Sequence, residues 1–293
     1  MPSISPVINK YIDPLTDFGF KRLFGSEPNK DLLMDLLNSI LDGRRHIADL
    51  EYNKNEHQAD IKEEGSAIFD LTCTADDGKR FIIEVQRGRQ ANFKKRAIFY
   101  TSLLATGQAP KGRRSEWAYN LPDIYFIALL EDFSVEENND GQYIRDICLA
   151  DKNTGKVFYD GLGYIFLELV NFAKSEKEVD SELDKWLYVL KNMSRMDKLP
   201  LFTRKTIFEK VFSIAEYSNM TGEEKTMYNT ALKRKWDNKN VLDYAVKTAK
   251  EEGIKVGIKE ERIKVVHSLK NMGMPVKDIA KAVGLTVEEI EQL

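Results

Sequence analysis

Apolar and polar residues alternate in short runs along the first 172 residues. Runs with the two-residue period of half-buried strands occur at 47–56, 67–75, 80–86, 123–132, 142–150 and 163–172. Helical spacing occurs at 31–41, at 91–107 and in a short segment that carries Phe18, Phe20, Leu23 and Phe24. This order of elements predicts an α/β fold in which helices pack on a mixed sheet.

The pattern changes after about residue 173, where strand signals stop and charged helical periodicity continues to the end of the sequence. We therefore expect two regions, an α/β domain over residues 1–172 and an all-helical region over residues 173–293.

Residues 274–293 have the spacing of a small helix-turn-helix. The core positions of this pair are Ile279, Val283, Leu285 and Ile290. Its second helix carries only acidic charges, on Glu288, Glu289 and Glu291. Those charges favour a packing or dimerisation module over a helix that reads the major groove of DNA, which remains the alternative.

The composition is that of a globular protein, with 42% hydrophobic and 31% charged positions among 293 residues. No apolar run approaches the roughly 20 residues of a membrane span, and the first residues lack the pattern of a secretory signal. Cys73 and Cys148 form neither a disulfide framework nor a zinc motif, so we interpret both as buried small hydrophobic residues. These features predict a cytoplasmic protein that does not enter a membrane.

Positive charge is concentrated in one stretch of a chain whose net charge is −3. Between residues 87 and 114 there is no acidic residue, and the basic residues are Arg87, Arg89, Lys94, Lys95, Arg96, Lys111, Arg113 and Arg114. Such a block predicts binding to a nucleic-acid backbone. The alternative is a solvated helix face followed by a solvated loop, and the block alone does not decide between them.

A candidate site comes from the two strand patterns that flank Asp76, Asp77 and Gly78. A three-residue hairpin loop places its last residue in the left-handed region, which suits glycine. With this loop, paired residues have numbers that sum to 154, so Asp70 lies directly opposite Glu84 on one face of the sheet. A two-residue loop would instead move Asp70 to the other face.

Two carboxylates placed opposite each other on otherwise apolar strands repel, so they must share a proton, pair with cations or bind a metal ion. Mg²⁺ and Mn²⁺ prefer carboxylate and carbonyl oxygens, and the candidate ligands are Asp70, Glu84 and Val85. Gln86 points to the same face as Glu84 and would be able to orient a water molecule. The alternative is an edge hairpin with a solvated face, and Ile82 on that face argues against it.

The helix predicted at 91–107 places a basic surface beside these carboxylates. Arg96 and Tyr100 are i,i+4 neighbours on it and form one patch. Metal-assisted hydrolysis of a phosphodiester needs this combination, because the metal activates water while basic residues hold the phosphate backbone. The candidate nucleic-acid contacts are Arg87, Arg89, Lys94, Lys95, Arg96 and Tyr100.

Three parts of the sequence together resemble the Rpn family of recombination-promoting nucleases and transposases, within the PD-(D/E)XK nuclease superfamily. They are the motif DPLTDFGFKRLFG at 13–25, the F-D and I-E-V-Q arrangement at 69–86, and the helix with Arg96 and Tyr100. The resemblance covers most of residues 10–175. It implies a restriction-endonuclease-like core, and a DNA endonuclease of recombination or transposition that uses Mg²⁺, with Mn²⁺ as a second candidate ion.

The resemblance also implies roles for single residues. Asp70 and Glu84 become metal ligands, and Gln86 takes the place of the superfamily's usual lysine, so a positive charge is missing there. Asp17 either caps the first helix or reaches the metal, and Glu56 is either an exposed strand end or part of the site. We further expect DNA and a second copy of the chain as partners. The alternative is a catalytically inactive DNA-binding or interaction protein on the same fold.

Overall fold

The computed structural model describes residues 9–53, 70–90, 92–107, 121–136, 140–203 and 206–293. Six described strands form one mixed sheet with the order β1-β2-β3-β4-β6-β5. The strands are β1 (Leu50–Tyr52), β2 (Leu71–Ala75), β3 (Arg80–Gln86), β4 (Ile124–Leu130), β5 (Ile144–Ala150) and β6 (Val157–Glu168). Strands β3, β4 and β6 run parallel, while the β1–β2, β2–β3 and β5–β6 pairs are antiparallel.

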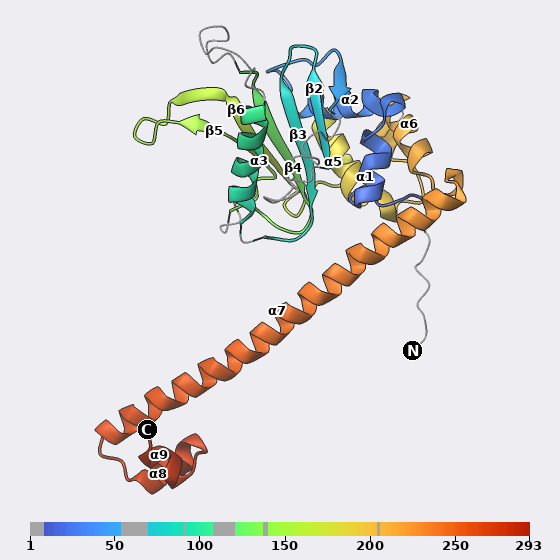
Figure 1. Cartoon of the computed structure of the whole chain (residues 1–293). Helices are drawn as coiled ribbons and strands as arrows, with labels where there is room; N and C mark the ends of the chain where they lie inside the picture. The colour runs from blue at the N-terminus through green and yellow to red at the C-terminus, as the bar shows by residue number, and fades with distance from the viewer. Residues whose placement is uncertain (1–8, 54–69, 91, 108–120, 137–139, 204–205) are drawn as a thin grey trace. The chain divides into compact units, whose positions relative to one another are not determined.

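Helices cover the sheet and form the C-terminal part of the chain (Figure 1). The α-helices among the described residues are α1 (Asp17–Phe24), α2 (Lys30–Ile40), α3 (Phe93–Gly107), α5 (Glu182–Asn192), α6 (Thr206–Ala215), α7 (Gly222–Asn271), α8 (Val276–Val283) and α9 (Val287–Glu291). Short 3-10 turns connect them at η1 (Glu27–Asn29), η3 (Glu176–Glu178), η4 (Met193–Arg195), η5 (Leu201–Thr203) and η6 (Tyr217–Asn219).

Two apolar layers, one on each face of the sheet, hold these elements together. Odd-numbered residues of β3 and β4, such as Phe81 and Ile127, pack against α1, α2, α5 and α6. Even-numbered residues, such as Ile82 and Phe126, pack against α3 on the other face (Figure 1). Side chains alternate between the two faces of a strand, so Glu84 points toward α3.

Two strands differ most from their predicted extents. Strand β6 begins at Val157 and not at residue 163, because pairing with Leu149 and Ala150 of β5 continues through residues whose side chains are exposed. An apolar pattern does not detect such a segment, since hydrogen bonds to the neighbouring strand hold it rather than burial. Strand β1 covers only Leu50–Tyr52 of the predicted run 47–56, whose last residues, 54–56, lie outside the described part of the chain.

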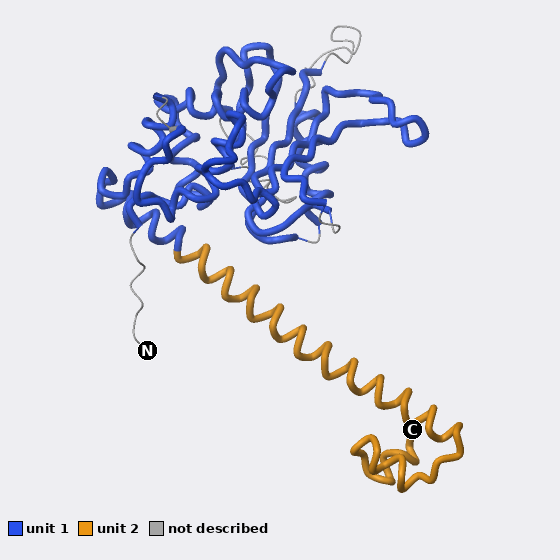
Figure 2. The backbone as a smooth tube through the Cα atoms, turned by 180° about the vertical axis from the view of Figure 1, so that it is seen from behind, with its two compact units in different colours: residues 1–232 blue, residues 233–293 orange. Residues whose placement is uncertain are grey.

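The strands end where the composition changes, but α5 and α6 pack into the same core as the sheet. The chain divides into two compact units, residues 1–232 and residues 233–293 (Figure 2).

In the second unit, α8 and α9 confirm the predicted helix pair, with Ile279 and Ile290 buried in a small core that includes Val266. Thr286 caps α9, and its backbone N–H donates to Glu289 at 2.8 Å.

The segment before α1 pairs with the segment that follows α6. Tyr11 forms a β-bridge with Glu216, and the N–H of Ile12 donates to the carbonyl of Ala215 at 2.9 Å. The Tyr11 ring packs edge-on against Phe212, with 4.9 Å between the ring centroids. Residues about two hundred positions apart therefore pack together within the first unit.

The two cysteines differ in their burial. Cys73 is buried as predicted, whereas Cys148 is only half-buried, because it lies on β5, at the edge of the sheet. Both are free thiols. Within the described residues, no helix has the length and apolar character that crossing a membrane requires.

Candidate active site

The loop of the β2–β3 hairpin has the predicted three residues. The N–H of Ala75 donates to the carbonyl of Lys79 at 2.8 Å, which closes the loop around Asp76, Asp77 and Gly78. Gly78 has a φ of 83°, in the left-handed region that favours glycine. The predicted turn conformation is therefore confirmed.

The same loop fixes the register of the two strands. The first pair of the hairpin is Leu71 with Ile83, and all four pairs have numbers that sum to 154, as predicted. Asp70 is the residue immediately before this pair, and Glu84 is the residue immediately after it. The two carboxylates therefore lie at the same end of the hairpin.

Asp70 is held by the strand that carries Glu84. Its Oδ2 accepts a hydrogen bond from the backbone N–H of Val85 at 2.7 Å. The N–H and C=O of a strand residue face the same neighbour, so the Val85 carbonyl also lies on the Asp70 side of β3. Burial raises the pKa of Asp70, and the hydrogen bond from Val85 partly offsets this increase. Asp70, Glu84 and Val85 thus lie together.

Glu84 is almost completely buried, with 5% of its surface exposed. Burial raises the pKa of its carboxyl group to about 8, and the negative charge of Asp70 adds to the increase. Its Oε1 is buried without a hydrogen-bond partner. An unsatisfied buried acceptor costs free energy, and a bound cation or an ordered water is the usual reason for one in a native structure.

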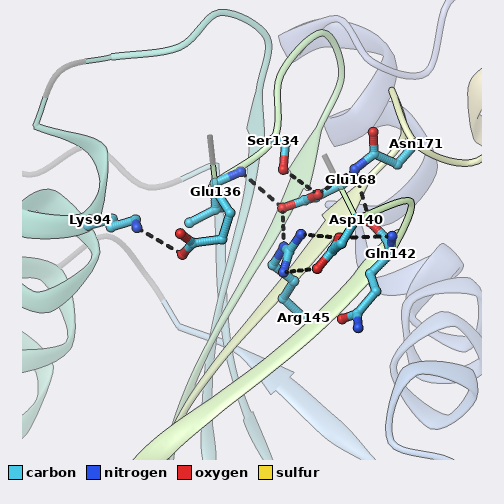
Figure 3. Close-up of polar contacts among 9 residues, drawn as sticks. Lys94, Ser134, Glu136, Asp140, Gln142, Arg145, Glu168 and Asn171 are labelled. Atoms are coloured by element: carbon cyan, nitrogen blue, oxygen red, sulfur yellow. Dashed lines mark hydrogen bonds and ion pairs between the residues drawn. The ribbon is translucent and has the colours of Figure 1, made fainter. Parts of the chain in front are cut away.

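A second buried glutamate has the opposite surroundings. Glu168, the last residue of β6, is fully buried, and Figure 3 shows the donors around its carboxylate. These donors are the Ser134 hydroxyl at 2.6 Å, the Val135 N–H at 2.9 Å, and the Arg145 and Asn171 side chains at 2.8 Å. Both carboxylate oxygens of Glu168 therefore have hydrogen-bond partners, which suits a structural role, whereas Glu84 keeps an oxygen available for a ligand.

Helix α3 brings the predicted Arg96 and Tyr100 to the carboxylates. Nη2 of Arg96 donates to Oε1 of Gln86 at 2.5 Å and lies 3.6 Å from Oε2 of Glu84. Tyr100 lies close enough to Glu84 that the glutamate charge raises its pKa further, after the larger effect of burial. Both helical residues therefore belong to the surroundings of the site.

Gln86 lies beside Glu84, and both ends of its amide are engaged. Its Oε1 accepts from Arg96, and its Nε2 donates to the carbonyl of Gly88 at 3.2 Å. The period of the strand is sufficient to place Gln86, but these hydrogen bonds depend on α3 and on the chain that follows β3.

The donor set fits a divalent ion that has few protein ligands. Mg²⁺ is usually held by one or two carboxylates, with waters and substrate phosphates in the other positions. Asp70, Glu84 and the Val85 carbonyl supply such a set. Within the described residues, no group of three or more His, Cys, Asp and Glu side chains is arranged to hold a metal ion, so an ion at this site would depend on solvent or substrate oxygens as well.

Acidic residues that are remote in sequence partly neutralise the basic block. Arg87 pairs with Asp132 at 3.3 Å, and Lys94 pairs with Glu136 at 2.9 Å, as Figure 3 shows for the second pair. Lys95 is exposed on α3, as Lys94 is.

Besides Arg96, the other basic residues of the block are Arg89, Lys111, Arg113 and Arg114. Arg89 is exposed, whereas Lys111, Arg113 and Arg114 lie outside the described residues. Among the described residues, the ion pairs of Arg87 and Lys94 therefore reduce the positive charge of the predicted surface.

Thr16, and not Asp17, caps the first helix. The Thr16 hydroxyl oxygen accepts from the N–H of Gly19 at 3.0 Å, whereas Asp17 is the first helical residue and pairs with Lys21 at 2.7 Å. The predicted Asp17 cap is wrong because Thr16, one residue earlier, has the extended backbone that a cap requires. Glu56, the other acidic candidate, lies outside the described residues.

Lys21 is a site neighbour that the sequence analysis misses. Its charge lowers the pKa of both Asp70 and Glu84. The packing of α1 explains its proximity, because a Cβ at Gly25 would lie 3.1 Å from Cδ2 of Leu71, the residue after Asp70. The only sequence feature that could have indicated this proximity is the position of Lys21 within the motif at 13–25.

A family model described as PD-(D/E)XK nuclease family transposase matches residues 14–245. The chain belongs to this family. No curated protein and no solved structure matches the chain. The region that matches the family contains the described sheet and α1 to α6, and it ends within α7. The mixed sheet with flanking helices is consistent with a PD-(D/E)XK nuclease-like fold, and family membership indicates a nuclease- or transposase-related function.

Proposed function

We propose that the protein is a divalent-metal-dependent DNA endonuclease that hydrolyses phosphodiester bonds. One observation carries this proposal: the half-buried Asp70 and the buried Glu84 meet at the end of one hairpin, and a Glu84 oxygen has no hydrogen-bond partner. Family membership supports the proposal, because a PD-(D/E)XK nuclease family implies DNA as the substrate and such nucleases generally use divalent metals. We propose Mg²⁺ as the ion, with Mn²⁺ as a substitute.

The protein's own residues would prepare the site for hydrolysis. An ion bound by Asp70, Glu84 and the Val85 carbonyl supplies activation of a water molecule and neutralises charge that develops on the phosphate. The Val85 N–H fixes the position of Asp70. Arg96 and Lys21 favour the ionised form of Glu84, because both lower its pKa.

We propose that the phosphate backbone of DNA lies along the start of α3 and the residues before it. The residues assigned to this contact are Arg87, Arg89, Lys94, Lys95 and Tyr100. Exposure of Arg89 and Lys95 supports the assignment. The pairs of Arg87 and Lys94 with acidic residues would have to exchange for phosphate contacts, which makes binding sensitive to salt.

Cleavage of supercoiled plasmid tests the proposal. Nicked and linear products are expected with Mg²⁺ or Mn²⁺ and not with EDTA. Asp70→Asn and Glu84→Gln each remove a charged ligand without a change in size, so each should slow cleavage by roughly a hundredfold or more, equivalent to about 3 kcal/mol of activation free energy. Glu209→Gln, an exposed glutamate on α6, is the matched control. Undiminished cleavage by Asp70→Asn would refute the proposal.

The second candidate is a catalytically inactive DNA-binding or interaction protein. It is favoured by the neutral Gln86, whose amide is already engaged by Arg96 and Gly88. Such a protein would bind DNA in EDTA as tightly as in Mg²⁺ and would leave plasmid intact under both conditions.

We also propose that two copies of the chain associate through α7. Leu242, Val246 and Val256 are exposed apolar residues of this helix. With Gly253 they are separated by four, seven and three residues, which places them along one face. A Cβ at Gly253 would meet no atom within 4 Å, so the face is open. Light scattering should give about twice the 33.7 kDa chain mass. The role in recombination or transposition and the cytoplasmic location stay predictions.

A further inference from the structure

The charged side chain of Arg96 points toward the sheet, unlike those of its neighbours on α3. Lys94 and Lys95 are exposed, whereas only 23% of the Arg96 side chain is accessible. Its guanidinium lies against Glu84 and Gln86 of β3. A cation turned toward the sheet in this way cannot follow the phosphate backbone of DNA without leaving its partners.

Several groups fix the guanidinium in this position. Besides its contacts with Glu84 and Gln86, it donates through Nη1 to Oε1 of Gln90. The rings of Phe93 and Tyr100 lie 5.5 and 5.7 Å from its central carbon, within the range of a cation–π contact. Gln86 is itself anchored on the Gly88 carbonyl. The arginine is therefore part of a built arrangement rather than a mobile surface side chain.

Two unpaired polar atoms lie within this same arrangement. Oε1 of Glu84 is a buried acceptor without a partner, and the Nε–H of Arg96 is a buried donor without a partner. An ion that takes the carboxylate oxygen, together with an oxygen ligand that accepts from the arginine, would satisfy both. This pairing of an open acceptor with an open donor points to a ligand between β3 and α3.

We propose that Arg96 is a positioning residue of the carboxylate site: it holds Glu84 and Gln86 in place from α3 and supplies the positive charge that β3 lacks at Gln86. It acts through Glu84 and Gln86 and is not one of the contacts to the DNA backbone. The catalytic consequence rests on the proposed endonuclease function, but the coupling of Arg96 to Glu84 does not.

A double-mutant cycle tests that coupling without any cleavage. Thermal unfolding in EDTA is measured at about pH 8.5, where the Glu84 carboxyl is ionised in the folded protein, for the parent, Arg96→Gln, Glu84→Gln and the double variant. Arg96→Gln should lower the melting temperature of the parent clearly and that of the Glu84→Gln variant much less, because the carboxylate it neutralises is then absent. Lys95→Gln, the exposed neighbour, should show no such coupling. Equal losses in both backgrounds would overturn the proposal.

DNA affinity measured against salt concentration separates positioning from backbone binding. Loss of one phosphate contact lowers the salt slope of log K by roughly 0.9 on duplex DNA. Lys95→Gln should show this loss, and Arg96→Gln should keep the slope of the parent. A slope reduced by about one unit in Arg96→Gln would make Arg96 a phosphate contact and overturn the proposal.

Cleavage kinetics provide the third measurement. Arg96→Gln should lower kcat by roughly 10–100-fold, as loss of residues that orient metal ligands does, with little change in KM for DNA. Added guanidinium should restore part of the activity of Arg96→Ala, whereas urea, which is neutral and of similar shape, should not. Equal rescue by both compounds, or rescue by neither, would show that the positive charge of Arg96 is not what the site needs and would contradict the proposal. A parent that never cleaves DNA would refute the endonuclease function, and the first two measurements would still decide the position of Arg96.

Discussion

The carboxyl group of Glu84 links the stability of the fold to pH. Its ordinary pKa is 4.5, and in the folded protein it rises to about 8. Between these two values, the folded protein retains a proton that the unfolded chain has lost. The free energy of unfolding therefore falls as pH rises through this window, and above about pH 8 the full penalty of a buried charge is present.

Glu84→Gln removes this penalty. At about pH 8.5 and in EDTA, its melting temperature should exceed that of the parent by roughly several degrees. At about pH 4, where the carboxyl is mostly neutral in both states, the two melting temperatures should nearly agree. Thermal unfolding at both values checks this, with Glu209→Gln as an exposed control that shifts neither. A parent and variant with the same pH dependence would contradict the assignment.

The same proton must leave when a metal ion binds. Metal affinity should therefore rise by about tenfold per pH unit from about pH 6 to 8 and level off above that, since one proton is exchanged for each ion. Calorimetric titration of Mn²⁺ in two buffers with different ionisation enthalpies measures this proton release directly. Affinity that does not change with pH would place the ion elsewhere.

At the level of elements, the hairpin was predictable because its information is local. The loop glycine and the two-residue period fix which residues face each other, and both are read within 20 residues. The contacts of Arg96 and Lys21 with the site depend on how α3 and α1 pack, which no local pattern contains. The acidic partners of the basic block were missed for the same reason, because Asp132 and Glu136 follow a different strand.

Gly78→Ala tests the loop. Its φ of 83° is strained for any residue with a Cβ, while the surrounding space is open, so strain is the only cost. The free energy of unfolding should fall by about 1 kcal/mol, as urea denaturation would measure. Gly222→Ala, at the start of α7 and also in open space, is the control and should cause no loss. Equal effects at both positions would show that the left-handed turn is not required.

At the level of the whole molecule, both units carry exposed basic residues, and only the last helix of the second unit is purely acidic. The exposed cations Arg89 and Lys95 belong to the first unit, and the second ends in the acidic α9. Sequence alone gives both charge patterns, but it does not show that Glu289 is already used to complete the cap of α9. Reversal of that charge would disturb the helix itself, so it is unsuitable as a probe of DNA binding.

Charge changes in each unit test which of them binds DNA. Arg89→Gln combined with Lys95→Gln should reduce the salt slope of log K by roughly 1.8, for two phosphate contacts. Glu288→Lys combined with Glu291→Lys, which spares the cap, should leave the slope unchanged. Affinity measured at several salt concentrations decides between the units. A steeper slope after the change in α9 would move a DNA contact to the C-terminal helices.

The bridge between Tyr11 and Glu216 has a consequence for synthesis on the ribosome. Tyr11 and Ile12 emerge early, but their backbone partners and the Phe212 ring are translated about two hundred residues later. A nascent chain can form the Asp70–Glu84 hairpin long before then, yet it lacks the α5 and α6 layer that covers the other face of the sheet. A translation product truncated before α6 thus exposes apolar strands, and proteolysis or aggregation is its expected fate.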